Sequence, residues 1–151
     1  MEKFDYQLPI RIHFGQGRME ETLKTELDRY GKTVMLAFGG HALKATGLYD
    51  RLIKILKDAG KNVIDFEGIM PNPTYAKAQE GARIARENHV DLILAAGGGS
   101  VADCCKVISA QACLDKDIWD YEYEEHQLPQ KFIPYGAIVT DSGTGAEENN
   151  G

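Results

Sequence analysis

Three consecutive glycines, Gly97, Gly98 and Gly99, stand between an apolar segment and Ser100, where a helical pattern begins. Glycine lets the backbone approach a ligand without interference from Cβ, and the N–H groups and dipole of a helix N-terminus favour an anion. One glycine would be explained by a tight turn alone, whereas three at the end of a strand favour a ligand. The spacing matches neither G-x-G-x-x-G nor a P-loop, since no Gly-Lys-Ser/Thr follows. We therefore predict a nucleotide phosphate site at these four residues.

A pair of glycines, Gly39 and Gly40, follows another apolar segment that ends at Phe38. The end of such a strand is where an α/β sheet commonly meets the adenosine part of a dinucleotide. A carboxylate there would bind the ribose 2′-OH and repel a 2′-phosphate, but this chain has glycine. His41 and Lys44 follow closely enough to supply hydrogen bonds or charge to that phosphate, although such residues more often serve as solvated loop or helix-start residues. The loop predicts an adenosine site with room for a 2′-phosphate.

A third loop rich in hydroxyl groups contains Thr140, Ser142, Thr144 and Gly145. It follows an apolar segment, as the two glycine loops do. Taken alone it is as consistent with a polar loop of no function as with a ligand site. Because the carboxyl ends of parallel strands meet at one edge of a sheet, three such loops favour a shared cleft.

The other reactive side chains form no recognisable catalytic set. The sequence contains no nucleophile elbow and no paired carboxylates with an identifiable reacting centre. The four histidines belong to no metal-binding motif: His13, His41, His89 and His126. The chemistry must therefore come from a cofactor or from residues outside this sequence.

Composition limits the partners of the chain. Its 151 residues are 43% hydrophobic and predict one domain, residues 1–151. The net charge is −6, and the 17 lysines and arginines are scattered, so neither nucleic acid nor an anionic membrane is an expected partner. No apolar run is long enough to span a bilayer and the N-terminus lacks a signal-peptide pattern, which predicts a cytoplasmic protein.

Three cysteines fall within one predicted helical region: Cys104, Cys105 and Cys113. Their odd number leaves no complete pairing, and neighbours on a helix point in different directions. A redox or metal-binding pair at Cys104 and Cys105 would need partner ligands at a recognisable spacing, and none is visible. We expect all three to be reduced thiols in the core.

Short apolar segments alternate with segments of helical periodicity. Those bounded by glycine, proline or asparagine predict strands over 33–38, 62–66, 91–96 and 135–140. Helical spacing predicts a helix ending at Gly60, one that begins after Thr74, and one along the three cysteines. The alternation predicts an α/β fold, a Rossmann-like parallel sheet with helices on both faces.

The N-terminus departs from this alternation. Residues 6–14 alternate like a strand and contain Pro9, which indicates an edge position, either as a single strand or as part of a hairpin. An exposed edge strand can pair with a second copy, so we expect a homodimer. A helix marked by Met19, Leu23 and Leu27 follows, and 115–131 reads as a surface connection with at most a helical turn.

The motifs together resemble one family, over nearly the whole chain. They are Phe14-Gly15-x-Gly17, Phe38-Gly39-Gly40 with Gly47-Leu48-Tyr49-Asp50, Pro71-Asn72-Pro73-Thr74, Gly97-Gly98-Gly99-Ser100-x-x-Asp103-x-x-Lys106, and 140–149. In these the chain resembles the nucleotide-binding domain of the iron-containing (group III) alcohol dehydrogenases, nearest to the NADPH-linked butanol dehydrogenase branch. The chain differs from the family pattern in two places. Asp141-Ser142 stands where the family has Leu-Pro, and Gly145-Ala146-Glu147-Glu148-Asn149 stands where it has Gly-Ser-Glu-Met-Asn.

The resemblance implies a nicotinamide dinucleotide cofactor, with NADP(H) expected in preference to NAD(H). It places the pyrophosphate at 97–100, Asp103 near the nicotinamide, Thr140 and Thr144 along the cleft, and Gly39 and Gly40 at the adenosine ribose. The family's Fe²⁺ or Zn²⁺ is held by a helical C-terminal domain that this sequence lacks. The substrates implied are small alcohols and aldehydes, and we expect the isolated chain to be inactive.

Other classes of function stay open at this point. A free-standing nucleotide-binding or interaction module would have the same motifs, and so would a relative of glycerol dehydrogenase or dehydroquinate synthase. A response-regulator-like domain would need acidic residues after the first strand, where Gly39, Gly40 and His41 stand.

Overall fold

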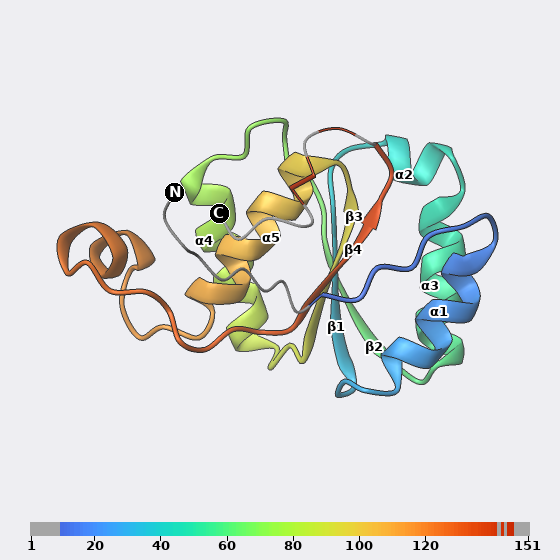
Figure 1. The fold of residues 1–151 in the computed structure, drawn as a ribbon, viewed down its shortest axis with the longest axis horizontal. Helices are drawn as coiled ribbons and strands as arrows, with labels where there is room; N and C mark the ends of the chain where they lie inside the picture. Colours follow the sequence, from blue (N-terminus) through green and yellow to red (C-terminus); the bar gives the residue numbers. More distant parts are fainter. Residues whose placement is uncertain (1–9, 142, 144, 147–151) are drawn as a thin grey trace, which may run out of the picture.

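Four parallel strands form the centre of the chain in the computed structural model, which describes residues 10–141, 143, 145 and 146 (Figure 1). The strands are β1 (Thr33–Phe38), β2 (Asn62–Phe66), β3 (Leu92–Gly97) and β4 (Tyr135–Val139). Their order in the sheet is β2-β1-β3-β4. The chain therefore moves outward from β1 to β2 and then crosses back over β1 to form β3.

The strands lie where the apolar segments predicted them, with ends that differ by at most one residue. The two central strands, β1 and β3, are buried almost throughout, because neighbouring strands and helices cover both their edges and both their faces. This explains their unbroken apolar sequences, which are typical of strands buried in parallel sheets.

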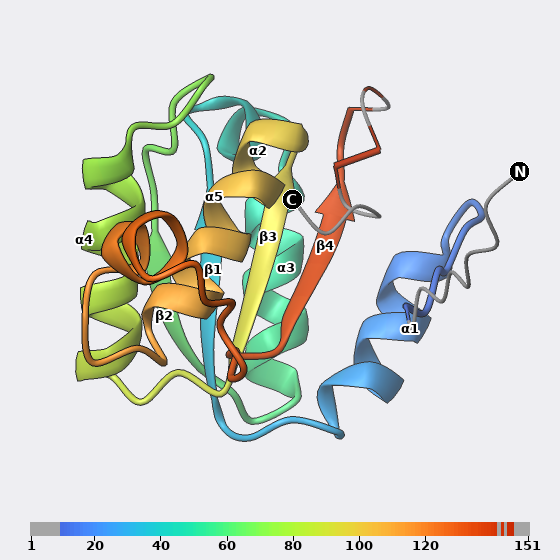
Figure 2. The same cartoon turned by 60° about the vertical axis from the view of Figure 1, so that its left-hand side comes forward.

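Helices cover both faces of the sheet, as predicted (Figure 2). Their bounds are α1 (Arg18–Leu27), α2 (Ala42–Ala45), α3 (Leu48–Asp58), α4 (Tyr75–Glu87) and α5 (Gly99–Gln111). Val34, Leu36 and Phe38 of β1 pack on one face with α1, α2 and α3. Met35 and Ala37 point to the opposite face and pack with α4 and α5. The alternation along β1 thus assigns its side chains to two separate cores.

Helix α4 begins at the predicted start signal. Thr74 is the N-cap residue, and its side-chain oxygen accepts a hydrogen bond of 3.3 Å from the backbone N–H of Lys77. Such a cap satisfies an N–H group that has no partner within the helix.

The N-terminal segment is the main correction to the sequence prediction. Residues 10–14 form no strand, and residues 6–9 lie outside the described residues. Arg11 instead donates a hydrogen bond of 2.6 Å to Glu26 of α1 and one of 3.3 Å to the hydroxyl of Tyr30. The alternating pattern needs a partner strand to cover its apolar side, and in the described part of the chain Phe14 remains 96% exposed. The homodimer expected from this strand remains a prediction.

The segment between α5 and β4 is a surface connection, as predicted (Figure 1). It contains one short π-helix, η1 (Asp120–Glu124), which the sequence pattern did not predict as a π-helix. The ring of Trp119 stacks on that of Tyr123, with 4.2 Å between centroids. Among the described residues, no helix combines the length and apolar character needed to cross a bilayer.

Candidate nucleotide-binding site

The glycine loops meet at the point where the strand order of the sheet reverses. Strands β1 and β3 are neighbours, but the connections that follow them lead to opposite sides of the sheet. Phe38 is paired with Ala96, so Gly39 and Gly97 come at the same level of the two adjacent strands. Ligands of open α/β sheets bind outside the carboxyl ends of the strands at such a reversal point.

The loop of three glycines has one position fixed by packing and one open position. A Cβ on Gly97 would stand 2.6 Å from Cγ2 of Val101, so packing against α5 alone requires glycine there. Gly98 is the N-cap of α5, and its carbonyl oxygen accepts hydrogen bonds from the N–H groups of Val101 and Ala102. A Cβ on Gly98 would have only ordinary contact with Asp141, at 3.5 Å. Packing therefore does not explain the glycine at position 98.

Ser100 has a structural role that the sequence did not indicate. Its Oγ accepts a hydrogen bond of 3.2 Å from the backbone N–H of Asn72, in the loop before α4. The hydroxyl hydrogen is not used by that bond. Ser100 can therefore hold this loop and still donate to a phosphate.

Gly39 is likewise constrained by its neighbours. Its carbonyl oxygen accepts a hydrogen bond of 3.0 Å from the N–H of Gly68, and an added Cβ would stand 3.1 Å from the carbonyl oxygen of Ile69. Gly40 has open space at the corresponding position. The close approach of the loop after β2 is therefore one reason for glycine at position 39.

Charged groups lie beside this loop, and one of them was missed by the sequence analysis. Lys44 of α2 forms an ion pair with Glu67, with Nζ and Oε2 2.5 Å apart. Glu67 directly follows β2, and its position at the carboxyl end of a strand was the signal that could have revealed it. The hydroxyl of Tyr49 donates a hydrogen bond of 2.5 Å to Asp65. That bond, together with burial, raises the pKa of Tyr49 to about 12.

The loop after β4 lies beside the triple glycine. The N–H of Thr140 donates a hydrogen bond of 3.1 Å to the carbonyl oxygen of Gly97. Asp103, on the second turn of α5, is half-exposed, and its carboxylate is 3.9 Å from Nζ of Lys106. Thr144 lies outside the described residues. The fold thus brings Gly39, Gly97 and Thr140 to one edge of the sheet.

Comparison with known proteins identifies the group to which this arrangement belongs. Residues 9–151 match the family model described as iron-containing alcohol dehydrogenase. The chain belongs to the iron-containing alcohol dehydrogenase family. The match covers the glycine loops, the Asn72-Pro73-Thr74 helix start and the loop after β4, which are among the motifs that resemble the family.

Members of this family that resemble the chain include proteins with different nicotinamide cofactors in their names. The chain is 42% identical over 151 residues to the probable NADH-dependent butanol dehydrogenase 1 of Bacillus subtilis, covering 100% of this chain and 38% of that protein. It is 35% identical over 153 residues to the NADPH-dependent aldehyde reductase YqhD of Escherichia coli, again covering 100% and 38%. The chain spans less than two fifths of the length of either relative.

A solved member of the family has the same fold. The crystal structure of NADH-dependent butanol dehydrogenase A from Thermotoga maritima superposes with a TM-score of 0.85 at 32% identity. The superposition covers 96% of this chain and 36% of the other.

The metal of an iron-containing alcohol dehydrogenase has no site among the described residues. Over 10–141, 143, 145 and 146, no group of three or more histidine, cysteine, aspartate or glutamate side chains is arranged to hold a metal ion. The residues of this part of the chain therefore do not fit the family's metal.

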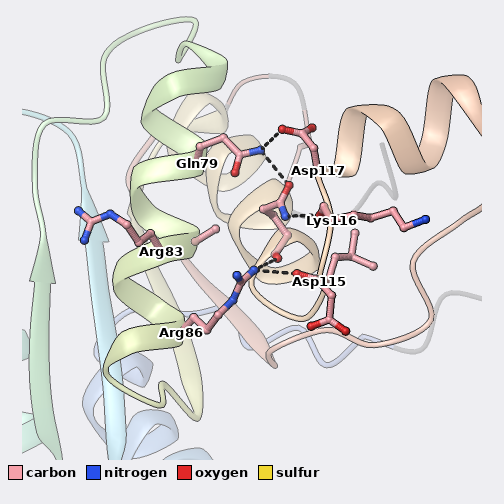
Figure 3. Close-up of a pocket in the computed structure, with 9 residues that line it drawn as sticks. Gln79, Arg83, Arg86, Asp115, Lys116 and Asp117 are labelled. Atoms are coloured by element: carbon pink, nitrogen blue, oxygen red, sulfur yellow. Dashed lines mark hydrogen bonds between the residues drawn. The ribbon is translucent and has the colours of Figure 1, made fainter.

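A polar hollow of about 190 Å³ lies on the outer side of α4, away from the glycine loops (Figure 3). The buried side chain of Gln111 accepts hydrogen bonds from Gln79 and from the N–H of Ile118. Arg86 donates hydrogen bonds to the carbonyl oxygens of Gln111 and Leu114. These side chains hydrogen-bond to one another and to the start of the surface connection. We therefore assign the hollow a structural role.

The cysteines fulfil the sequence prediction only in part. Cys104 and Cys105 are buried free thiols, and burial raises the pKa of Cys104 to about 11 and also raises that of Cys105. Cys113 is exposed, which contradicts its prediction as a core residue. Helix α5 ends at Gln111, so the helical spacing that would have directed Cys113 to the core no longer holds.

Proposed function

We propose that this chain, residues 1–151, is the cofactor-binding domain of an enzyme that transfers hydride between a nicotinamide dinucleotide and a small alcohol or aldehyde. The observation that carries the proposal is the meeting of the Gly39 and Gly97–Gly99 loops at the reversal point of the sheet. The names of the relatives, an NADH-dependent butanol dehydrogenase and an NADPH-dependent aldehyde reductase, support this class of cofactor and substrate.

The cofactor would be bound mainly by the backbone. Gly98, Gly99 and Ser100 begin α5, a helix of 13 residues, and so supply N–H groups and a helix dipole to the pyrophosphate. Gly97 sets the path of this loop. Gly39 and Gly40 would border the adenosine ribose. Thr140 and Thr144 would line the cleft, and Asp103 would lie toward the nicotinamide.

The metal would be bound by residues beyond this sequence. Bound there, Fe²⁺ or Zn²⁺ would supply a Lewis acid for the oxygen of the alcohol or aldehyde. The described residues form no binding site for such an ion. We therefore expect the isolated chain to bind the cofactor without reducing an aldehyde. We also propose a homodimer, since a second copy would cover the side chain of Phe14, which is 96% exposed.

We further propose that NADP(H) is preferred to NAD(H). Gly39 itself adds no carboxylate that would repel a ribose 2′-phosphate, and Lys44 on the following helix, which is paired with Glu67 but exposed to a ligand, supplies a positive charge. Because the names of the relatives include both NADH and NADPH, they do not favour either cofactor. The proposed preference for NADP(H) is therefore argued from residues of this chain.

The proposal can be tested by calorimetric titration of the chain with NADH and with NADPH, comparing Gly98→Ala with the unmodified protein. The added methyl group fits the fold at 3.5 Å from Asp141 but would keep the pyrophosphate away from the start of α5. We expect affinity for both cofactors to fall about tenfold or more, a loss of about 1.4 kcal/mol.

Gly136→Ala is the matched control. Its methyl group would stand 3.6 Å from Cδ1 of Leu94, within β4 rather than in the glycine loop. It should bind as the unmodified chain does. An unmodified chain that binds neither cofactor, or a folded Gly98→Ala variant with unchanged affinity, would contradict the proposed site.

A further inference from the structure

We propose that the ion pair of Lys44 and Glu67 sets the choice between NADPH and NADH in this chain. Lys44 binds the ribose 2′-phosphate, whereas Glu67 competes for Lys44 and accepts a hydrogen bond from the 2′-OH. The inference rests on the proposed dinucleotide function and assigns its cofactor specificity to two side chains from different elements.

The fold holds Glu67 beside the glycine loop. Ala37 of β1 is paired with Phe66 of β2, so Glu67 follows β2 at the level of Phe38, the last residue of β1. The N–H of Gly68 then donates to the carbonyl oxygen of Gly39, and the N–H of Ile69 donates to that of Phe38. These bonds, of 3.0 and 3.2 Å, hold the two residues that follow Glu67 against the end of β1. A carboxylate therefore lies next to position 39 although the residue at 39 is glycine.

Lys44 is held in reach of the same place. Its Nζ lies 2.5 Å from Oε2 of Glu67 and over the rings of Phe38 and Tyr49, at 5.4 and 5.3 Å from their centroids. A ring face attracts a cation, and both rings are fixed because they also pack on each other. The hydroxyl of Tyr49 is occupied by Asp65, so this tyrosine offers Lys44 a neutral ring.

Both charges are accessible to a ligand. The side chains of Lys44 and Glu67 are 42% and 41% exposed, respectively, so the pair sits at the surface and not within the core. Water weakens the attraction within an exposed ion pair, and a phosphate carrying up to about two negative charges can compete with one carboxylate for the ammonium. The arrangement can thus open to accept a 2′-phosphate.

The two side chains have opposite effects on the cofactor. Without Glu67, Lys44 would be free to bind the 2′-phosphate, and the carboxylate that competes with the phosphate for Lys44 would be gone. Without Lys44, the carboxylate of Glu67 would repel the 2′-phosphate and still accept a hydrogen bond from a 2′-OH. The structure therefore predicts that loss of either partner changes the same ratio of affinities in opposite directions.

The experiment measures the dissociation constants of NADPH and NADH for the chain and for Glu67→Gln and Lys44→Met. These replacements keep the length of each side chain, and the methionine can still pack on the two rings. We expect Glu67→Gln to raise the preference for NADPH about tenfold and Lys44→Met to lower it about tenfold. Because the change depends on charge, it should shrink as salt is added.

A second exposed ion pair provides a matched control. Lys54 and Asp58 of α3 are also 2.5 Å apart, but they lie in the later half of that helix, away from the glycine loops. Lys54→Met and Asp58→Asn should leave the ratio unchanged. Competition by adenosine 2′-phosphate and by adenosine 5′-phosphate adds a readout confined to the adenosine end, where only the 2′-phosphate should respond to Lys44→Met.

The outcomes separate this inference from the proposed function. If both cofactors bind and neither Glu67→Gln nor Lys44→Met changes their ratio, the inference is overturned while dinucleotide binding stands. Changes of the ratio in the same direction would also overturn it. If the unmodified chain binds neither cofactor, the proposed function itself is contradicted. Circular dichroism of each variant shows whether it has folded.

Discussion

The backbone N–H of Asn72 donates a hydrogen bond of 3.2 Å to Oγ of Ser100, which joins the loop before α4 to the first turn of α5. Asn72 has a φ of 51°, in the left-handed region that asparagine adopts more readily than most residues. The bond links two motifs that are 28 residues apart in the sequence. It makes the candidate phosphate loop and the loop across from it one connected unit.

Replacement of Ser100 should therefore affect both stability and binding. Ser100→Ala removes the acceptor of the Asn72 N–H group, and we expect the free energy of unfolding to fall by about 1 kcal/mol. Cofactor affinity should fall as well, since the loop loses its hydroxyl donor. Urea unfolding and calorimetric titration measure the two effects. Ser100→Thr keeps the hydroxyl and should lose less of both, so an equal loss in the two variants would count against this role.

Gly81 allows the close packing of α4 on α5. A Cβ there would stand 2.4 Å from Cδ1 of Ile108 and 2.9 Å from Cε1 of Phe66, in a fully buried region. We expect Gly81→Ala to destabilise the fold by about 1–3 kcal/mol through overpacking. Thermal unfolding measures this, with Gly40→Ala as the control because nothing lies within 4 Å of its added methyl group. Equal stability of the two variants would contradict the packing.

Gln111 supports the start of the surface connection through its buried side chain. Its Oε1 accepts a hydrogen bond of 2.7 Å from the N–H of Ile118, which is itself buried. Gln111→Leu would leave that N–H group without its acceptor, so we expect a loss of about 1–3 kcal/mol in chemical denaturation. The exposed Gln130→Leu serves as control and should change little. A variant at position 111 as stable as the control would refute the assignment.

The three thiols should react at very different rates. Cys113 is exposed, whereas burial raises the pKa of Cys104 and Cys105 and hides both from reagents. A thiol-specific reagent should label Cys113 in the folded chain and the other two only after denaturant is added. Cys113→Ser should abolish the rapid labelling. Rapid labelling of that variant would show that the buried thiols are accessible.

Tyr49 should make stability depend on pH in the alkaline range. Its pKa is about 12 in the folded chain against an ordinary value of 10.0, chiefly because its hydroxyl donates to Asp65. The stabilisation is fully present below the ordinary pKa and is lost as the pH rises through the folded value, because the unfolded chain releases the proton first. Tyr49→Phe should lose less stability than the unmodified chain between about pH 10 and about pH 12 in urea unfolding. Parallel losses would exclude this coupling.

Local sequence determined most of the elements. The apolar runs predicted all four strands, most clearly β1 and β3, which are covered on both faces. The Asn72-Pro73-Thr74 signal predicted the start of α4. The strand predicted over residues 6–14 is absent from the described part, 10–14. An alternating pattern forms a strand only where another strand is available to pair with it. The prediction of Cys113 as a core residue was wrong because α5 ends at Gln111, and helical spacing predicts burial only within a helix.

The glycine loops were recognisable from sequence because glycine changes what the backbone itself can do, and this requires no knowledge of distant residues. Only the tertiary structure distinguished Gly97 from Gly98. A side chain at position 97 would clash with Val101, whereas position 98 has room for a Cβ. Only the strand order placed Glu67 beside Gly39 and paired it with Lys44, 23 residues away in the chain. Residue type and spacing describe a loop, whereas the charge that surrounds a loop comes from neighbouring strands, and which strands become neighbours is decided by the packing of the whole sheet.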